Sequence, residues 1–462
     1  MSEASINQDD LPTTWVLTNL GSVINYGSTS KAEPHEIADD DWVLELEDIE
    51  KDSSRLLQKR TFLRRQSKST KNHFQAGDVL YGKLRPYLNK VLIAGEPGYC
   101  TTEILPLKAG PHIDNRYLFY WLKHPVFLKY VEAESHGMNM PRLGTETGKA
   151  APFVLAPRNE QTHIANQLDT LLTRVQACND RFDAIPALLK RFRQTVLDAC
   201  LLEDQLAQPV ETGIQPWALR TVGSVCASIS DGPFGSNLKS DDYTSAGVQV
   251  VRLENIGHLF FDAKKETFIS AEKYKTLSKH TLKKGDLLFS SFVDEEVRVC
   301  EFPIGTLTIN KADCFRLRVD ETQCNRHFLL YRLACKSTYQ SLKDQVHGAT
   351  RPRINLTQLR GYEILLPPLA KQAEIVRRVE ALFALAAHIE ARYTTARTQA
   401  QRLTPLVLAK AFRGELVPQD PNDEPARALL ACIASSNTAV AGKNKQKVPV
   451  ALKERAQEAI NL

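Results

Sequence analysis

The sequence predicts an α+β chain in which two globular α+β domains are joined by two long helices that pair as an antiparallel coiled coil. Three observations support this fold class: an internal repeat, short strand-like segments in both halves, and two stretches with heptad spacing of apolar residues. The 462 residues allow several domains at roughly 100–200 residues each.

The repeat consists of short motifs that recur at a nearly constant offset. The segment that begins at Trp15 recurs from Trp217, and Gly77-Asp78 recurs as Gly285-Asp286. From His136 onward, one offset of 211 residues holds without a gap into the second long helix. Chance would not hold one offset over about 60 residues, so the chain is expected to have pseudo-two-fold symmetry between two similar halves.

The first part of each half, residues 1–157 and 207–368, is rich in short β-like runs bounded by turn residues. Each part contains one helical stretch, Asn115–Val131 in the first half and Asn325–Gln345 in the second. Both parts are therefore predicted to be mixed α+β globular domains.

The second part of each half, residues 158–206 and 369–418, is predicted to be one long helix. Apolar residues follow a 4-3 spacing, which is the seam of a coiled coil, and about 45 helical residues make a rod of roughly 65–70 Å. Pro186 and Pro405 lie inside the pattern and are expected to kink or locally break the helices. The first predicted seam contains Ile164, Leu168, Leu171, Val175, Cys178, Phe182, Ile185, Leu189, Phe192, Val196 and Ala199. Residues 419–462 lie outside the repeat and are predicted to form a polar tail with short helical segments.

Composition excludes several protein classes. A hydrophobic fraction of 43% is too high for a disordered chain, and no apolar run approaches the ~18–20 residues of a membrane span. The nine cysteines form no CxxC pair, and the acidic, polar N-terminus is not a secretory signal. We therefore expect a soluble, reduced, cytoplasmic protein without a membrane partner, whose net charge of +5 permits a polyanionic partner.

Motifs for catalysis are missing. Gly77–Leu84 nearly matches a phosphate-binding loop, but Leu84 replaces the hydroxyl residue that would hold magnesium. The sequence contains no GxGxxG, HExxH or GxSxG motif. Asp231–Gly235 superficially resembles an amino-methyltransferase motif but lacks its second proline, so a loop is the simpler interpretation. We expect no catalytic residue and no metal site in this chain.

Two similar domains on a rod-like spacer suit the recognition of two different half-sites on double-stranded DNA. Arginine is suited to guanine edges, amide side chains to adenine, and lysine to phosphates. His136 and Arg142 recur as His347 and Arg353, which favours a shared structural turn and leaves a role in base recognition open. The candidate DNA-binding residues are Arg64, Lys83, Arg85, Asn89, Lys90 and Arg142 in the first domain, and Lys239, Arg252, Lys311, Arg351 and Arg353 in the second.

The sequence around the start of each long helix resembles the specificity (S) subunit of type I restriction–modification systems. The resemblance covers about residues 10–418 and is most specific in three segments, which are residues 155–172, 182–197 and 366–376. It implies target recognition domain 1 at 1–157, conserved spacer helix 1 at 158–206, target recognition domain 2 at 207–368 and conserved spacer helix 2 at 369–418.

The resemblance also implies a function. The chain would be a non-catalytic, sequence-specific DNA-binding subunit that reads a bipartite asymmetric target. Two methyltransferase subunits and two restriction/translocase subunits would assemble with it for adenine N6 methylation or restriction. S-adenosylmethionine, ATP and Mg²⁺ would be used by those partners, so this chain itself would bind no cofactor. The alternative is a two-armed coiled-coil scaffold or interaction protein without DNA specificity.

Overall fold

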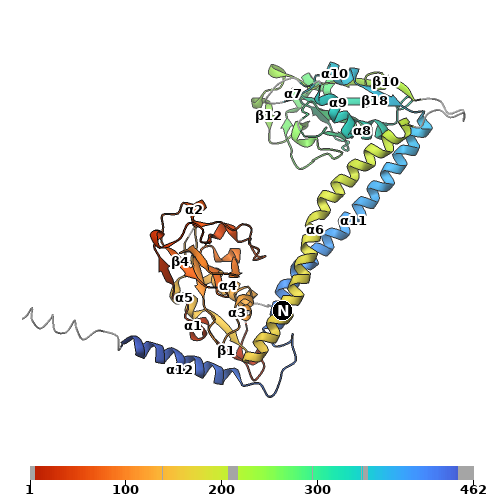
Figure 1. Ribbon diagram of the computed structural model, residues 1–462. Helices are drawn as coiled ribbons and strands as arrows, with labels where there is room; N and C mark the ends of the chain where they lie inside the picture. The colour runs from red at the N-terminus through yellow and green to blue at the C-terminus, as the bar shows by residue number, and fades with distance from the viewer. Residues whose placement is uncertain are drawn as a thin grey trace, which may run out of the picture. The chain divides into compact units, whose positions relative to one another are not determined.

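The computed structural model describes residues 6–137, 139–206, 217–293, 295–344, 346 and 352–445 (Figure 1). The chain divides into two compact units. Unit 1 consists of the described parts of residues 1–182 and 396–462, and unit 2 consists of those of residues 183–395. Each long helix contributes to both units, so each unit contains one globular domain together with segments of both helices.

The strands of unit 1 form two main sheets and one small one. The four-stranded sheet has the order β2-β4-β7-β3, the three-stranded sheet has the order β6-β5-β8, and β1 pairs with β9. All pairs are antiparallel except β3 with β7. The strands are β1 (Val16–Asn19), β2 (Ser30–Ala32), β3 (Val43–Leu44), β4 (Lys71–Phe74), β5 (Val79–Gly82), β6 (Val91–Ile93), β7 (Gly98–Thr101), β8 (Ile104–Leu107) and β9 (Pro152–Leu155).

The helices of unit 1 cover an aromatic core that includes Trp15, Tyr117, Trp121 and Phe153. The sequence predicts one helical stretch from Asn115, but the structure has two helices there, because Pro125 begins the second one with His124 as its cap. The helices are α1 (Leu20–Val23), α2 (Phe62–Arg65), α3 (Asn115–Leu122), α4 (Pro125–Glu134), α5 (Thr145–Ala150) and α12 (Ala426–Lys445).

Unit 2 repeats this plan with a second four-stranded sheet in place of the three-stranded one. Its sheets have the orders β11-β18-β15-β16 and β12-β14-β13-β17, and β10 pairs with β19 as β1 does with β9. The strands are β10 (Ala218–Thr221), β11 (Cys226–Ser230), β12 (Tyr243–Thr244), β13 (Val248–Val251), β14 (Phe268–Ile269), β15 (Leu287–Ser290), β16 (Val299–Glu301), β17 (Thr308–Asn310), β18 (Cys314–Val319) and β19 (Glu363–Leu366). The helices are α7 (Ala271–Leu277), α8 (Arg326–Ala334), α9 (Lys336–Lys343) and α10 (Leu356–Gly361).

The two long helices are α6 (Arg158–Leu206) and α11 (Leu369–Ala411), and their pairing is antiparallel (Figure 1). In unit 1, Ile164 near the start of α6 lies in one apolar core with Leu408 near the end of α11. In unit 2, Leu197 near the end of α6 shares a core with Ile375 near the start of α11. This confirms the predicted antiparallel pair.

Two details of the helix prediction differ from the structure. Pro186 and Pro405 lie inside continuous helices and break neither of them. The predicted seam is buried at Ile164, Leu168 and Val196, whereas Phe192 is 36% exposed and Cys178 is exposed. Leu189 in the middle of the seam is also buried, but a two-helix pair covers each helix on one side only, so other side chains there stay partly in solvent. Among the described residues, none of the helices is both long and apolar enough to cross a membrane.

Candidate nucleic-acid interface

Two loops of unit 1 are held together by main-chain hydrogen bonds next to β5. The amide of Arg85 donates to the carbonyl of Pro141 at 2.7 Å, and the amide of Leu143 donates to the carbonyl of Lys83 at 3.0 Å. The amide of Lys83 donates in turn to the carbonyl of Glu103 at 3.0 Å. We call this set of bonds the loop frame of unit 1. It fixes the backbone at residues 83–85, whichever side chains stand there.

The loop frame brings together backbone segments that carry cations and apolar side chains at the surface of unit 1. Lys83, Arg85 and Arg142 all lie on the framed segments, and Tyr87 and Met140 nearby are 46% and 52% exposed. Arg85 has a left-handed backbone at φ 50°. Arg142 is paired, since its Nε lies 3.1 Å from Glu103 Oε2. The unpaired positive charge of this surface therefore rests on Lys83 and Arg85, neither of which has an ion pair within the described residues.

Three other candidate residues of unit 1 lie outside this surface. Asn89 is 7% exposed and takes a left-handed turn, and its amide donates to the carbonyl of Pro86. The ammonium of Lys90 donates to the carbonyl of Leu46 at 2.7 Å, so both residues contribute to the fold. Arg64 is exposed on α2, and no contact recorded for the described residues connects it to the framed loops.

Unit 2 contains the same frame with different side chains. The amide of Val293 donates to Pro352 at 3.1 Å, that of Ile354 to Ser291 at 3.0 Å, and that of Ser291 to Asp313 at 2.9 Å. Ser291 and Val293 thus occupy the places that Lys83 and Arg85 occupy in unit 1.

The arginine at the end of the frame also recurs with its partner. Arg353 corresponds to Arg142, and its guanidinium lies 3.6 Å from Asp313 and 5.5 Å from the ring of Phe292. Both arginines therefore face an acidic residue of their own unit, which fits the interpretation as a shared structural turn. Arg351 and His347 lie outside the described residues.

The cations of unit 2 gather instead around Tyr243 on β12. The ammonium of Lys311 lies 5.2 Å from the ring centroid, and the guanidinium of Arg252 lies 5.8 Å from it. Arg252 also pairs with Glu254 at 3.4 Å, whereas Lys311 has no acidic partner within the described residues. Lys239 is exposed, and its amide donates to Asp242 at 2.7 Å. We call Tyr243, Arg252 and Lys311 the Tyr243 cluster.

Each globular domain is anchored to its long helix by a buried glutamine. In unit 1, Gln161 Oε1 accepts from the amide of Asp114 at 2.9 Å, and Nε2 donates to the carbonyl of Ala156 at 2.9 Å. In unit 2, Gln372 Oε1 accepts from the amide of Asn325 at 2.6 Å, and Nε2 donates to the carbonyl of Pro367 at 2.8 Å. The sequence shows the recurrence of these glutamines, but not their role.

A second side-chain contact accompanies each glutamine. In unit 1, Arg116 lies 2.7 Å from Asp169 on α6. In unit 2, His327 takes the place of Arg116, and its ring nitrogens lie 3.0 Å from Glu380 on α11 and 3.0 Å from Glu301 on β16. Each pair ties the domain to the side of its helix.

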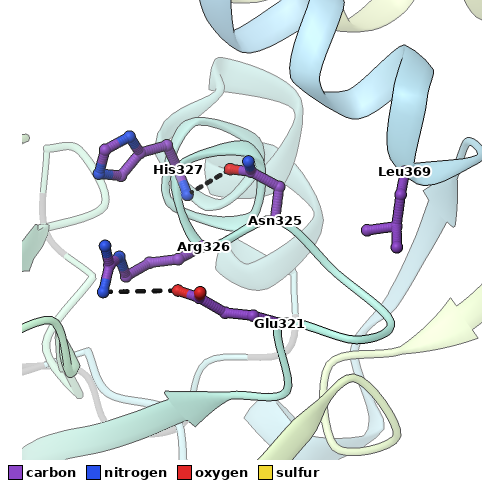
Figure 2. A pocket seen from close by; sticks show the side chains of 5 residues that line it. All are labelled: Glu321, Asn325, Arg326, His327 and Leu369. Carbon is purple, nitrogen blue, oxygen red and sulfur yellow. Dashed lines mark hydrogen bonds and ion pairs between the residues drawn. The ribbon is translucent and has the colours of Figure 1, made fainter.

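A pocket beside the anchor of unit 2 is lined by Glu321, Asn325, Arg326, His327 and Leu369. Figure 2 shows Arg326 directed toward Glu321 and the Asn325 side chain accepting a bond from the amide of His327. The guanidinium of Arg326 lies 3.4 Å from Glu321 and 3.5 Å from Glu301. The positive charge is thus compensated, and the pocket is no site for an anion.

No metal-binding group was found in the described parts of the chain, where no three His, Cys, Asp or Glu side chains come together suitably. The strongest surface features there are the framed loops and the Tyr243 cluster, which combine cations with aromatic side chains. Such surfaces suit nucleic acid, whose phosphates attract cations and whose bases pack on aromatic rings.

Comparisons with known proteins agree with this interpretation. A family model described as the type I restriction modification DNA specificity domain matches residues 215–395. The type I restriction enzyme StySPI specificity subunit of Salmonella potsdam is 29% identical over 360 residues, which is 74% of this chain and 76% of that protein. The EcoKI specificity subunit of Escherichia coli (strain K12) is 27% identical over 352 residues, 72% of this chain and 74% of that protein.

Solved structures share the fold. A chain from a study of complex assembly and conformational transition of the type I R-M system matches with a TM-score of 0.69 and 19% identity, covering 88% of this chain and 99% of that one. The HsdS subunit from Thermoanaerobacter tengcongensis matches with a TM-score of 0.56 and 19% identity, covering 88% and 98%. With its repeated α+β domains and antiparallel helices, the chain is similar in sequence and in fold to type I restriction enzyme specificity subunits.

Proposed function

We propose that this chain is the DNA-binding specificity subunit of a type I restriction–modification complex, and that each globular domain reads one half of a bipartite, asymmetric target. The observation that carries the proposal is the loop frame. Both units keep the same main-chain bonds, but Lys83 and Arg85 in unit 1 are partly exposed, whereas Ser291 and Val293 at the same places in unit 2 are buried and offer no side chain to DNA. Identical half-sites would be served by identical side chains, whereas different ones call for this divergence.

The candidate cations fall into two groups, according to whether an acidic residue pairs with them. Lys83 and Lys311 have no acidic partner within the described residues, which suits phosphate contact. Arg85 stands on a left-handed turn and its Nη2 donates to the carbonyl of Asn139 at 3.4 Å, and a guanidinium at this place is suited to the edge of guanine. Arg142 and Arg353 are already paired with acidic residues and are proposed to support their loops.

The long helices would separate the two half-sites and carry the partner subunits. Several large apolar side chains on them are exposed, which suits packing against another protein; these are Leu188, Phe192, Leu385, Ile389, Leu403 and Leu406. Two methyltransferase subunits and two restriction/translocase subunits would assemble here. Those partners would methylate adenine at N6 or cleave DNA with S-adenosylmethionine, ATP and Mg²⁺. This chain would act in the cytoplasm as a non-catalytic subunit.

The proposal is tested by sequencing the methylome of cells that express this chain with its methyltransferase partner. We expect one new bipartite motif with N6-methyladenine on both strands. A double variant, Lys83→Ala with Arg85→Ala, should weaken methylation while the motif's second half stays defined. If wild-type cells show no bipartite motif, the chain is no specificity subunit, and the two-armed scaffold would then account better for the fold.

The spacer role has a separate test. Four residues, about one helical turn, inserted after Leu206 should change the gap between the two halves of the motif. An unchanged gap would mean that the helices do not set the spacing.

A further inference from the structure

Unit 2 exposes an aromatic side chain whose loop takes part in none of the features described above. Phe234 follows β11 in the segment 231–238, and 59% of it is exposed to solvent. Single exposed apolar residues are common on protein surfaces, so exposure alone indicates nothing. The loop that carries this ring distinguishes Phe234 from other exposed apolar residues.

The backbone that carries Phe234 is fixed on both sides. The carbonyl of Asp231 accepts a hydrogen bond from Nδ1 of His280 at 2.9 Å, and the carboxylate of Asp231 accepts from the amide of Gly232 at 2.7 Å. A Cβ on Gly232 would lie 2.2 Å from the carbonyl carbon of Lys311, the residue that follows β17. The loop therefore packs directly against the main chain there. Leu238, only 3% exposed, holds the other end in the core.

The same contacts join the loop to the main chain of a residue with a positively charged side chain. Gly232 touches the backbone of Lys311, whose ammonium belongs to the Tyr243 cluster. Lys239, one residue after the loop, is exposed as well. An exposed aromatic ring on a loop that adjoins Lys239 in sequence and the backbone of Lys311 matches the chemistry of nucleic acid, where lysines reach the phosphates and the ring reaches the bases. A protein partner would call for a larger continuous apolar patch.

We propose that Phe234 contacts the bases of the DNA half-site read by unit 2, while Lys239 and Lys311 contact its phosphates. The proposal rests on the proposed function and adds a base-contacting residue to it. The main-chain bonds hold the loop without DNA, so little conformational entropy is lost when the ring binds. The free energy gained by burying the ring therefore contributes to affinity and to discrimination between bases.

The test uses the full chain assembled with its methyltransferase partner. The probes are a duplex with the bipartite motif found in the methylome and a duplex with the second half-site scrambled. Phe234→Ala should weaken binding to the motif duplex roughly tenfold or more, the range of one lost base contact. Binding to the scrambled duplex should stay the same, because phosphate contacts remain. Phe234→Tyr, which keeps the ring, should restore most of the affinity.

Phe260→Ala is the matched control, since Phe260 is 60% exposed in the same unit and its ring packs over Gly257. It should bind both duplexes as the wild type does. Lys311→Ala should instead weaken both and reduce the salt slope by about one.

Equal binding of Phe234→Ala and the wild type to the motif duplex would overturn the proposal, as would equal losses on both duplexes. If the wild type itself does not distinguish the duplexes, the proposed function fails. Unchanged thermal unfolding of Phe234→Ala, expected for so exposed a ring, keeps loss of folding apart from loss of contact. If that variant is unstable, Phe234→Leu gives the same comparison.

Discussion

Replacing Gln161 by leucine should loosen the first globular domain from α6. The side chain of Gln161 is fully buried and bonds to Asp114, Ala156 and His112. Leucine has a similar volume but can neither donate nor accept, so the change removes the bonds without opening a large cavity.

The magnitude follows from the groups left without partners. The bonds to Asp114 and Ala156 are both 2.9 Å long, whereas the bond to His112 is 3.4 Å and weak. Two buried polar groups without partners cost about 1–3 kcal/mol each, partly offset by the apolar side chain, which gives about 3 kcal/mol in all. For a unit of this size that corresponds to a fall in Tm of about 6–12 °C.

Calorimetry of the full chain measures the fall in Tm, and hydrogen exchange should show faster exchange of the amide of Asp114. Gln167→Leu is the control, because Gln167 is exposed on the same helix. It should change stability by less than about 0.5 kcal/mol. A Gln161→Leu chain that melts within about 2 °C of this control would refute the anchoring argument.

Three further substitutions test other contacts. Arg65→Ala leaves the buried carboxylate of Asp48 without its partner and should cost about 3–5 kcal/mol in urea unfolding; a loss below about 1 kcal/mol would contradict this. Arg142→Ala removes an exposed pair with Glu103 and should change the same free energy by less than about 1 kcal/mol. Burial raises the pKa of Asp231 to about 6, so its favourable contribution is present at acidic pH and lost as pH rises through about 6. Asp231→Asn should therefore show a smaller fall in Tm between acidic and neutral pH, and parallel curves for variant and wild type would exclude this role.

The long-period features of the sequence predicted most of the fold. The offset of 211 residues located both halves, and the 4-3 spacing located α6 and α11. Finer detail depended on local chemistry. Cys335 takes an extended conformation that ends α8 and precedes α9, although no proline marks the division. Such a break between two helices depends on tertiary packing, and the spacing of apolar residues along the sequence does not reveal it.

The candidate site was harder to predict because the sequence does not show which groups a lysine side chain contacts in the folded protein. Lys83 and Lys90 lie seven positions apart in one basic run, yet Lys90 donates to a carbonyl 44 residues away, while Lys83 has no ion pair within the described chain. The anchors left a better signal. Gln161 and Gln372 are polar, recur at the repeat offset and stand at the start of a helix, a combination that points to a shared structural bond.

The loop frame has a consequence for how new recognition could arise in this chain. Its bonds join only amides and carbonyls, so the partly exposed side chains at 83 and 85 can be exchanged without removing the bonds that hold the loops of unit 1. A mutation there changes the chemistry offered to a ligand at little cost to folding. Varying residues 83 and 85 is therefore a practical starting point for a subunit with altered preference, whereas the buried Ser291 and Val293 do not allow it.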